Sequence, residues 1–422
     1  MTTEDLRRAL EALRNGVPNR DAVRVLGCGQ TVVIDRFRTQ LDEAPVAGQQ
    51  GRQAAGMVVA GGFGSGKSHL LEHLRHLALE ANFVCSLVAV SKETPLYDPA
   101  KLYAAAVAAA VVPGVTGHAV HEVALRLRPD AASYSQFFLA LNREDNALSR
   151  IFPATLLLHE RLMHDPEMLE KVRGFWAGER LSLADVRGGL RQIGQAAAYP
   201  LRSVPLKQLA LQRFAFAAGL AKAAGYSGWV LLIDEVELIG RYSRLQRAGS
   251  YSELARWLGR VEAEQFPGIT TVAAITNDFA LAVLQGKGDL EYVVPQLESR
   301  NTDQHRSLAG RAATGMRIIE RETVALAPPD VAVLDQTCEA LRGIHARAYG
   351  WDPPPARSVA PTALHRAMRS YVRRWINEWD LQRLYPGEAI ETVETELTID
   401  YLESPDLEAP QDGAQDEPAA RG

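Results

Sequence analysis

The stretch AGGFGSGKSH, residues 60–69, decides the fold of this chain. Residues 61–68 satisfy the pattern G-x4-G-K-[ST]; they follow a short apolar segment (57–60) and precede a segment with helical periodicity. In a strand–loop–helix context of this kind, glycines let backbone N–H groups turn toward phosphate oxygens, and the helix N-terminus favours negative charge. The alternative is a flexible Gly/Ser turn, which needs neither the strand nor the helix. The stretch therefore predicts a nucleotide-binding α/β protein.

The pattern assigns a role to the side chains of this loop. Lys67 would reach the β- and γ-phosphates of ATP, and Ser68 would ligate Mg²⁺. The predicted nucleotide contacts comprise the loop and the first helical turn: Gly61, Gly62, Phe63, Gly64, Ser65, Gly66, Lys67, Ser68 and His69. ATP and Mg²⁺ are therefore the predicted cofactors.

A second stretch, WVLLIDEVE (229–237), carries two acids at the end of an apolar run. The carboxylates of Asp234 and Glu235 would emerge at the carboxyl end of a buried strand, where ligands bind in α/β proteins. Asp234 would hold Mg²⁺ through water, and Glu235 would act on the attacking water as general base. The alternative is a pair of solvated acids at a strand end. Together with the glycine loop, the pair favours hydrolysis over binding alone.

A third apolar run ends in AITNDF (274–279), which places Thr276 and Asn277 at the same edge of the sheet. An amide at this edge would orient the attacking water or contact the γ-phosphate, so Asn277 is the predicted catalytic residue and Thr276 the second choice. The alternative is an Asn that caps a helix over 278–285.

Arginines near the end of the core could complete the site, because phosphoryl transfer gains from an arginine at the developing charge. The candidates in residues 298–317 are Arg300, Arg306, Arg311 and Arg317. Arg311 is preferred as a finger that acts on an adjacent subunit, because we expect it in a Gly/Ala-rich loop before the last strand. The alternative for each of them is a solvated or salt-bridged arginine.

Further arginines, Arg366, Arg369 and Arg373, share one face of a predicted helix over 362–383. One of them, Arg366 in the preferred assignment, would reach the phosphates from a helical lid. The same stripe could contact DNA phosphates or be a solvated face.

Short apolar strands that alternate with helices predict a parallel sheet with helices on both faces. The expected strands are 57–60, 83–91, 228–235, 270–277 and 316–329. No convincing strand is expected between 99 and 226. The predicted units are an N-terminal helical segment (1–50), an ATPase core (51–329) with a helical insertion at about 115–205, a C-terminal helical lid (330–402) and an acidic, disordered tail (403–422).

The composition excludes several classes of protein. The chain has 422 residues, of which 47% are hydrophobic and 23% charged, as is usual for a soluble protein of two or three lobes. The net charge of −5 argues against wholesale attraction to nucleic acid. Three isolated cysteines (Cys28, Cys85 and Cys338) indicate neither a disulfide framework nor a zinc site. The N-terminus lacks the apolar core of a signal peptide, and no apolar run approaches the ~20 residues of a membrane span, so we expect a cytoplasmic protein.

The order GGFGSGKS, LLIDE and AITN, followed by a helical lobe, resembles AAA+ ATPases. Residues 27–30 form a turn that could surround an adenine, although an ordinary turn is nearly as good an interpretation. The resemblance implies that Gly29 and Gln30 contact the base, but Gln30 stands where that family usually has Arg.

The chain is more closely similar to ATP-binding proteins of bacterial BREX phage-defence systems, the BrxD-like family. The similarity covers most of residues 4–400, and GFGSGKSHLL (62–71) and LIDEVELIGRY (232–242) are its most specific segments. It implies a partner DNA helicase, or another protein of the same defence system. The long helical insertion is a surplus over what ATP binding needs and suggests a docking site for a partner.

The main hypothesis is therefore an Mg-ATP-hydrolysing AAA+ protein of antiphage defence that acts on DNA or on a DNA helicase. DNA would be contacted through a local basic face around 366–374, and a homo-oligomer is compatible with the sequence. The first alternative is a nucleotide-loaded signalling switch without substantial turnover, and the second is a P-loop kinase of a small molecule.

Overall fold

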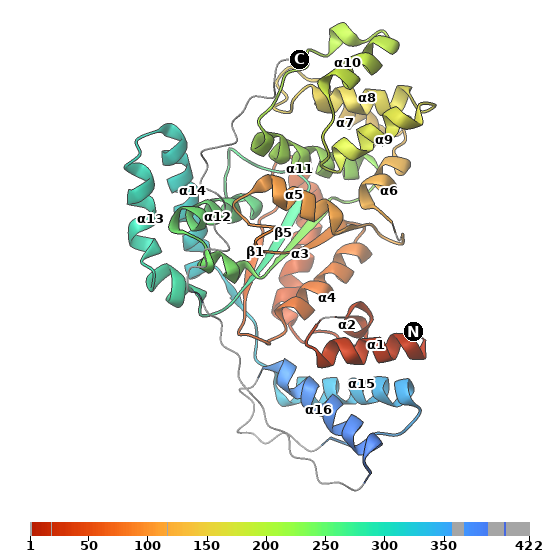
Figure 1. The fold of residues 1–422 in the computed structure, drawn as a ribbon, viewed down its shortest axis with the longest axis vertical. Coiled ribbons are helices and arrows are strands. Elements are labelled where there is room, and N and C mark those ends of the chain that lie inside the picture. The colour runs from red at the N-terminus through yellow and green to blue at the C-terminus, as the bar shows by residue number, and fades with distance from the viewer. Residues whose placement is uncertain (1, 18, 116, 357–366, 387–400, 402–422) are drawn as a thin grey trace.

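The computed structural model describes residues 2–17, 19–115, 117–356, 367–386 and 401. Its centre is a six-stranded sheet in the order β3-β2-β4-β5-β1-β6 (Figure 1). Five strands are parallel, and the short edge strand β3 is antiparallel to β2. The strands are β1 (Met57–Ala60), β2 (Val84–Ala89), β3 (Ala110–Val111), β4 (Trp229–Asp234), β5 (Ile269–Ile275) and β6 (Val324–Ala325). The predicted α/β class is confirmed.

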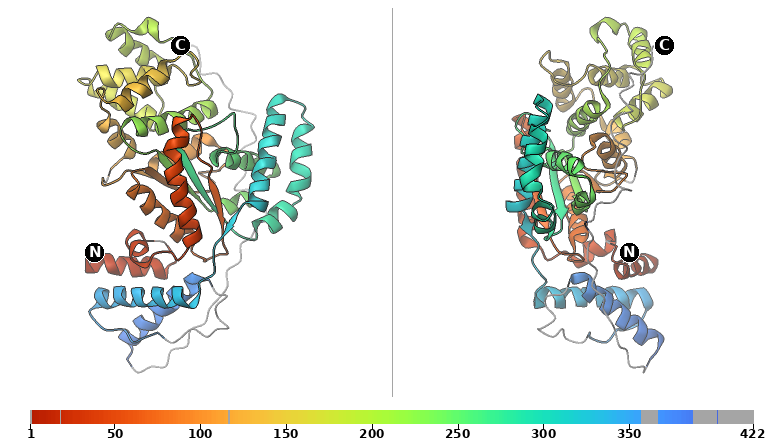
Figure 2. Two further views of the ribbon diagram at one scale, coloured as in Figure 1. Left: turned by 180° about the vertical axis from the view of Figure 1, so that it is seen from behind. Right: turned by 60° about the vertical axis from the view of Figure 1, so that its left-hand side comes forward.

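Helices cover both faces of this sheet, and the strands are apolar on both sides as a result. Successive side chains of a strand point to opposite faces, so Val230 and Leu232 of β4 share one hydrophobic cluster with α3 (Thr31–Gln49) and α4 (Lys67–Glu80). The long helix α3 lies along this face in Figure 2. Leu231 and Ile233 belong to the cluster of the opposite face. That face carries α5 (Pro99–Ala108), α11 (Leu206–Ala223) and α12 (Arg244–Trp257).

The expected strand over 316–329 is wrong for most of its length. Helix α14 (Asp303–Arg321) continues through residues 316–321, and β6 has only two residues. The apolar side chains of this segment recur at helical spacing, because Ala312, Met316 and Ile319 are all buried. Helix α14 packs on α12 and forms a hairpin with α13 (Asp289–Glu298) at one side of the molecule (Figure 1). The expected absence of a strand between 99 and 226 is also wrong, because β3 pairs with β2.

Five helices and a 3-10 turn between β3 and α11 form a compact addition at the end of the molecule opposite α15 and α16 (Figure 1). They are α6 (Ala119–Arg126), α7 (Ala132–Asn142), α8 (Ile151–Arg161), α9 (Pro166–Trp176), α10 (Leu183–Gln192) and η1 (Ala196–Ala198). Aromatic side chains join the addition to the core: the ring of Phe216 in α11 lies 4.9 Å from Phe152 and 5.6 Å from Trp176, centroid to centroid. The addition therefore shares one hydrophobic core with the sheet.

The first and last described helices form a lobe of their own, here called the terminal lobe. It consists of α1 (Thr3–Arg14), α2 (Arg20–Leu26), α15 (Val331–Tyr349) and α16 (Met368–Leu384). Leu10 of α1 is buried in one cluster with Leu341 and Trp375. The predicted segment 1–50 is thus divided, since α1 and α2 pack with the C-terminal helices and α3 packs on the sheet. No described helix is long and apolar enough to cross a membrane.

Candidate functional site

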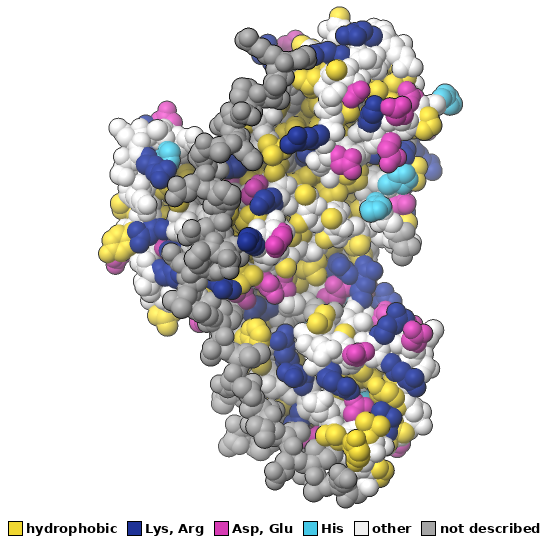
Figure 3. All heavy atoms as spheres, viewed as in Figure 1, with side chains coloured by type: hydrophobic (Ala, Val, Ile, Leu, Met, Phe, Trp, Pro, Cys, Tyr) yellow, Lys and Arg dark blue, Asp and Glu magenta, His cyan; other side chains and the backbone are white. Residues whose placement is uncertain are grey.

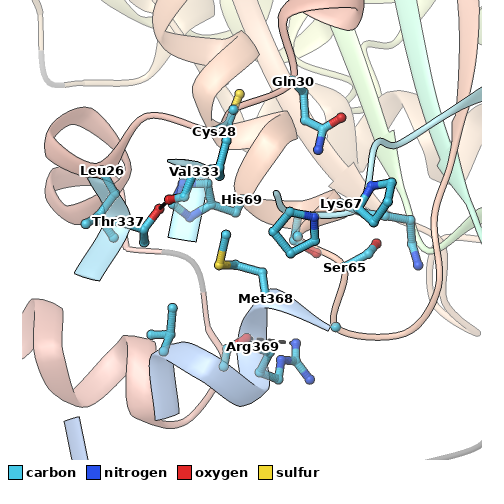
Figure 4. Close-up of a pocket in the computed structure, with 18 of the residues that line it drawn as sticks. Leu26, Cys28, Gln30, Ser65, Lys67, His69, Val333, Thr337, Met368 and Arg369 are labelled. Carbon is cyan, nitrogen blue, oxygen red and sulfur yellow. Dashed lines mark hydrogen bonds between the residues drawn. The ribbon is translucent and has the colours of Figure 1, made fainter. Parts of the chain in front are cut away.

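A cavity of about 240 Å³ lies between the carboxyl edge of the sheet and the terminal lobe. Six parts of the chain contribute to its lining, and they lie within residues 13–17, 26–30, 63–69, 234–237, 327–337 and 368–372. Figure 4 shows an apolar end with Leu26, Val333 and Met368 and a polar end with Ser65 and Lys67. The cavity is therefore amphipathic along its length.

The glycine loop joins β1 to α4 at the polar end of the cavity. Gly66 has a φ of +100°, and it precedes α4 without any side-chain cap, so the first N–H groups of this helix are open to an acceptor. A Cβ atom at Gly61 would collide with the Ser65 hydroxyl oxygen. That hydroxyl is buried and has no hydrogen-bond partner among the described residues. These features fit a bound phosphate, which supplies the acceptors that the open N–H groups and the hydroxyl lack.

Lys67 is folded back onto the loop. Its Nζ donates to the carbonyl oxygens of Gly61 (2.9 Å) and Gly62 (3.4 Å). It also lies 3.4 Å from the Glu237 carboxylate. Glu237 belongs to η2 (Val236–Arg241), the 3-10 turn after β4, and was not among the predicted site residues. The sequence does contain a signal for Glu237, because this third acid stands two residues after Glu235.

The acid pair lies where the sequence analysis expects it, at the end of β4. Glu235 has a φ of +55°, a backbone conformation that non-glycine residues rarely adopt, and its N–H donates to the Asp234 carboxylate (2.9 Å). Both residues line the cavity. Burial raises the pKa of Glu235; the Asp234 carboxylate also raises it, and the Lys67 ammonium lowers it. Local strain of this kind is concentrated at functional sites.

Strand β5 lies between β1 and β4, so its end lies between the glycine loop and the acid pair. Asn277 follows this strand on the surface, and a Cβ atom on Gly62 would lie 3.9 Å from its Oδ1. The capping alternative is wrong, because η3 (Ala280–Gln285) has Phe279 at its N-cap and no side-chain cap. Asn277 does not line the cavity itself.

The neighbours of Asn277 are held by Tyr401. Its hydroxyl donates to Asp278 (3.0 Å) and lies 2.6 Å from the Thr276 hydroxyl, which is then the donor in that pair. Thr276 is thus engaged with another side chain. Tyr401 could not be assigned to this edge from the sequence, since more than a hundred residues separate it from Thr276.

The turn at residues 27–30 lies beside the first turn of α4, which follows the glycine loop. His69 in α4 donates from Nε2 to the Gly27 carbonyl (2.6 Å), and burial lowers its pKa. Gln30 does not point its amide freely into the cavity. The amide donates to the Ala327 carbonyl and accepts from the Ala327 N–H, both at 2.9 Å. Gly29 and Gln30 line the cavity, and Gln30 also fastens the segment that leads into α15.

Of the arginines considered on the last helix, Arg369 is the one that the structure places at the glycine loop. Its guanidinium lies 5.0 Å from the Phe63 ring centroid and donates to the Gly16 carbonyl (3.0 Å). Its backbone N–H donates to the Gly64 carbonyl (3.2 Å). Burial lowers the pKa of Arg369. Arg366, the preferred lid residue, lies outside the described residues. Arg373 is exposed on the same helix.

The expectation that Arg311 lies in a loop is wrong, because it lies within α14. Its guanidinium donates to Glu264 (2.7 Å) and to the Ser252 hydroxyl (2.8 Å). It does not line the cavity of its own chain. The helical periodicity described for this segment explains why the loop expectation failed.

The segments that carry the loop, the acid pair and the terminal lobe match a known protein family. The model of the BREX system ATP-binding protein BrxC/D matches residues 2–123 and 207–384, well over half of the chain. This chain belongs to the BREX system ATP-binding protein BrxC/D family. The expected family is thereby confirmed, and membership supports an ATP-binding role in a defence system. No curated protein and no solved structure gave a significant match.

The family match omits residues 124–206, which contain α7 to α10. The site described above lies entirely in the matched segments, apart from Tyr401. No group of three or more His, Cys, Asp or Glu side chains in the described ranges could hold a metal ion.

Proposed function

We propose that this chain is an Mg²⁺-dependent AAA+ ATPase of a BREX-type antiphage defence system. The observation that carries the proposal is the position of Glu235, an exposed acid in a strained backbone conformation beside Asp234 that lines the same cavity as Lys67. A protein that only sensed nucleotide would have less need of a carboxylate at that point. The raised pKa of Glu235 suits a general base, because it increases the carboxylate's affinity for the proton of the attacking water.

The cavity offers a place for each part of ATP. The apolar end around Leu26, Val333 and Met368 would hold the base, and the glycine loop would hold the phosphates. Lys67 would leave its loop carbonyls for the β- and γ-phosphates, and Asn277 would orient the water. Mg²⁺, held by Ser68 and Asp234, would neutralise charge on the phosphates.

Arg369 is the proposed lid arginine, because it already contacts Phe63 and Gly64 of the loop. It would report the state of the phosphates to the terminal lobe, which it joins to the loop. Arg311 would act as a finger only if it left Glu264 and reached the site of a neighbouring copy, so this role requires a homo-oligomer.

The partner would be a DNA helicase or another protein of the same system, and the helices within 124–206 are the proposed docking element. Direct contact with DNA would rest on a local basic face, since Lys and Arg are interspersed with Asp and Glu on the face drawn in Figure 3. Arg373 is the candidate left for such a face on α16, because Arg369 is turned to the loop and Arg374 pairs with Glu378.

The test is ATP hydrolysis by the full chain with and without Mg²⁺, DNA and the partner helicase, together with the mass of the protein in ATP. We expect Mg²⁺-dependent turnover that DNA or the partner stimulates. If no combination supports turnover although ATP binds, the second candidate is favoured. That candidate is a nucleotide-loaded switch, and the observation in its favour is that both the sheet edge and the terminal lobe line the cavity, which would slow nucleotide exchange.

A further inference from the structure

One buried carboxylate in the cavity has no part in the proposed hydrolysis. Glu237 is 6% exposed and lines the cavity from the turn after β4. Its Oε1 lies 3.4 Å from Lys67 Nζ, and its Oε2 is buried without a hydrogen-bond partner among the described residues. A buried carboxylate is normally paired and fully hydrogen-bonded, because its desolvation is costly. A buried carboxylate with only one oxygen engaged, next to a candidate phosphate site, therefore requires an explanation.

Lys67 explains what this carboxylate does in the absence of nucleotide. An ammonium group has three donors, and Lys67 has three acceptors: the carbonyls of Gly61 and Gly62 and the carboxylate of Glu237. Lys67 must give up at least one of them to reach a phosphate. Glu237 is the charged acceptor of the three and therefore the strongest competitor of a phosphate for Lys67.

We propose that Glu237 is a positioning residue that competes with the nucleotide phosphates for Lys67 and thereby weakens the binding of ADP. This inference rests on the proposed function. The effect is specific to the β- and γ-phosphates, because these are the groups that Lys67 would contact and from which Glu237 holds it away. After loss of the γ-phosphate, the return of Lys67 to Glu237 favours release of ADP.

If Glu237 had a purely structural role, its replacement would weaken nucleotide binding instead of strengthening it. If Glu237 only fixed the turn over 236–241, its replacement would disturb Asp234 and Glu235 and weaken every nucleotide. Competition for Lys67 instead predicts stronger binding, and only of nucleotides that carry a β-phosphate. AMP lacks that phosphate and is therefore the internal control.

The experiment measures the dissociation constants of ADP and AMP for the full chain in Mg²⁺ by calorimetry. Glu237→Gln removes the charge and keeps the shape, and we expect ADP to bind about tenfold more tightly. Glu237→Asp retracts the carboxylate from Lys67 but keeps the charge, so its ADP affinity should lie between those of the wild type and Glu237→Gln. AMP affinity should be the same in all three proteins.

Glu235→Gln is the charge-matched control, because it removes the same charge from the same cavity without breaking the pair with Lys67. Its gain in ADP affinity should be clearly smaller than that of Glu237→Gln. Unchanged or weaker ADP binding by both Glu237 variants, or an equal gain for AMP, would overturn the inference. If the wild type bound neither ADP nor ATP, the proposed function itself would fail, which is a different outcome.

Discussion

The nucleotide cavity and the inserted helices α7 to α10 differ in where their unpartnered buried polar groups lie. Around Trp176 in α9, the indole N–H donates to Thr155 (3.1 Å) and the carbonyl accepts from the Tyr103 hydroxyl (2.5 Å), whereas Nε2 of the adjacent His159 is buried without a partner and lines no cavity described above. In the cavity, the Ser65 hydroxyl and one oxygen of Glu237 are buried without partners. Paired groups stabilise a fold, whereas open groups aimed into a cavity indicate a ligand. The interior of the insertion is therefore built for stability, and the cavity for binding.

The family match follows the same division, because it covers the cavity and omits 124–206. Both regions nevertheless share one hydrophobic core through Phe216. Changes inside the insertion should then alter stability and leave nucleotide chemistry intact, and changes at the cavity should do the reverse.

The largest expected effect is on stability, from Trp176→Ala. Trp176 is fully buried, and truncation of a buried Trp lowers the free energy of unfolding by about 3–5 kcal/mol. Urea unfolding followed by circular dichroism measures this loss. Leu139→Ala is the control on the exposed surface of the insertion and should stay within about 0.5 kcal/mol of the wild type. A change of ADP affinity in folded Trp176→Ala protein would contradict the claim that the insertion acts on stability alone.

The next effect concerns pH and tests the cavity. Glu235 acts as a base only when it is deprotonated, and burial raises its pKa above the ordinary value of 4.5. Turnover should therefore fall as the pH drops through this raised pKa, about tenfold per pH unit below it. The acid limb of the pH profile of kcat measures this fall in turnover. A melting curve at each pH is the control for unfolding. A limb at or below pH 4.5 would contradict the assignment of the base.

A smaller effect is expected at the rim of the cavity, from Gln30→Ala. The change removes both hydrogen bonds to Ala327 and loosens the segment that leads into α15, so ADP binding should weaken by about 1 kcal/mol, roughly fivefold. Gln40→Ala is the matched control, because its amide also donates to a backbone carbonyl, that of Ala55, but away from the cavity. Equal effects of the two changes would show that Gln30 has no special relation to the nucleotide.

The smallest effect should come from Tyr401→Phe. Loss of the hydroxyl frees Thr276 and Asp278 on either side of Asn277, and turnover should fall about two- to threefold, or ~0.5 kcal/mol, with ADP affinity unchanged. Steady-state kinetics measures the change. Tyr385→Phe, at an exposed tyrosine, should have no effect. A change in ADP affinity without a change in turnover would contradict the proposed link between Tyr401 and catalysis by Asn277.

The sequence predicted the parts of the site that depend on local pattern. A glycine loop between a strand and a helix has a specific spacing, and acids at the end of an apolar run lie at the carboxyl edge of a sheet. The same reasoning failed for residues 316–321, where an apolar run was interpreted as a strand although its spacing suits the helix that packs on α12.

Contacts between distant segments could not be predicted from one sequence. Gln30 meets the backbone of Ala327, and Tyr401 meets Thr276, because the tertiary fold brings them together. The same is true of α1, whose apolar stripe gives no indication that it packs against α15 and α16. Local periodicity specifies which face of an element is buried but not what covers it.

The central claim is that Glu235 makes this chain an ATPase, and one comparison tests it most directly. Single-turnover phosphate release from Mg-ATP is measured for the wild type and for Glu235→Gln under the effector condition that gives the fastest wild-type rate, with ATP affinity measured in parallel. The account predicts a loss of about 10²–10⁴-fold in the rate with ATP binding retained. A Glu235→Gln rate within a few-fold of the wild type would contradict it.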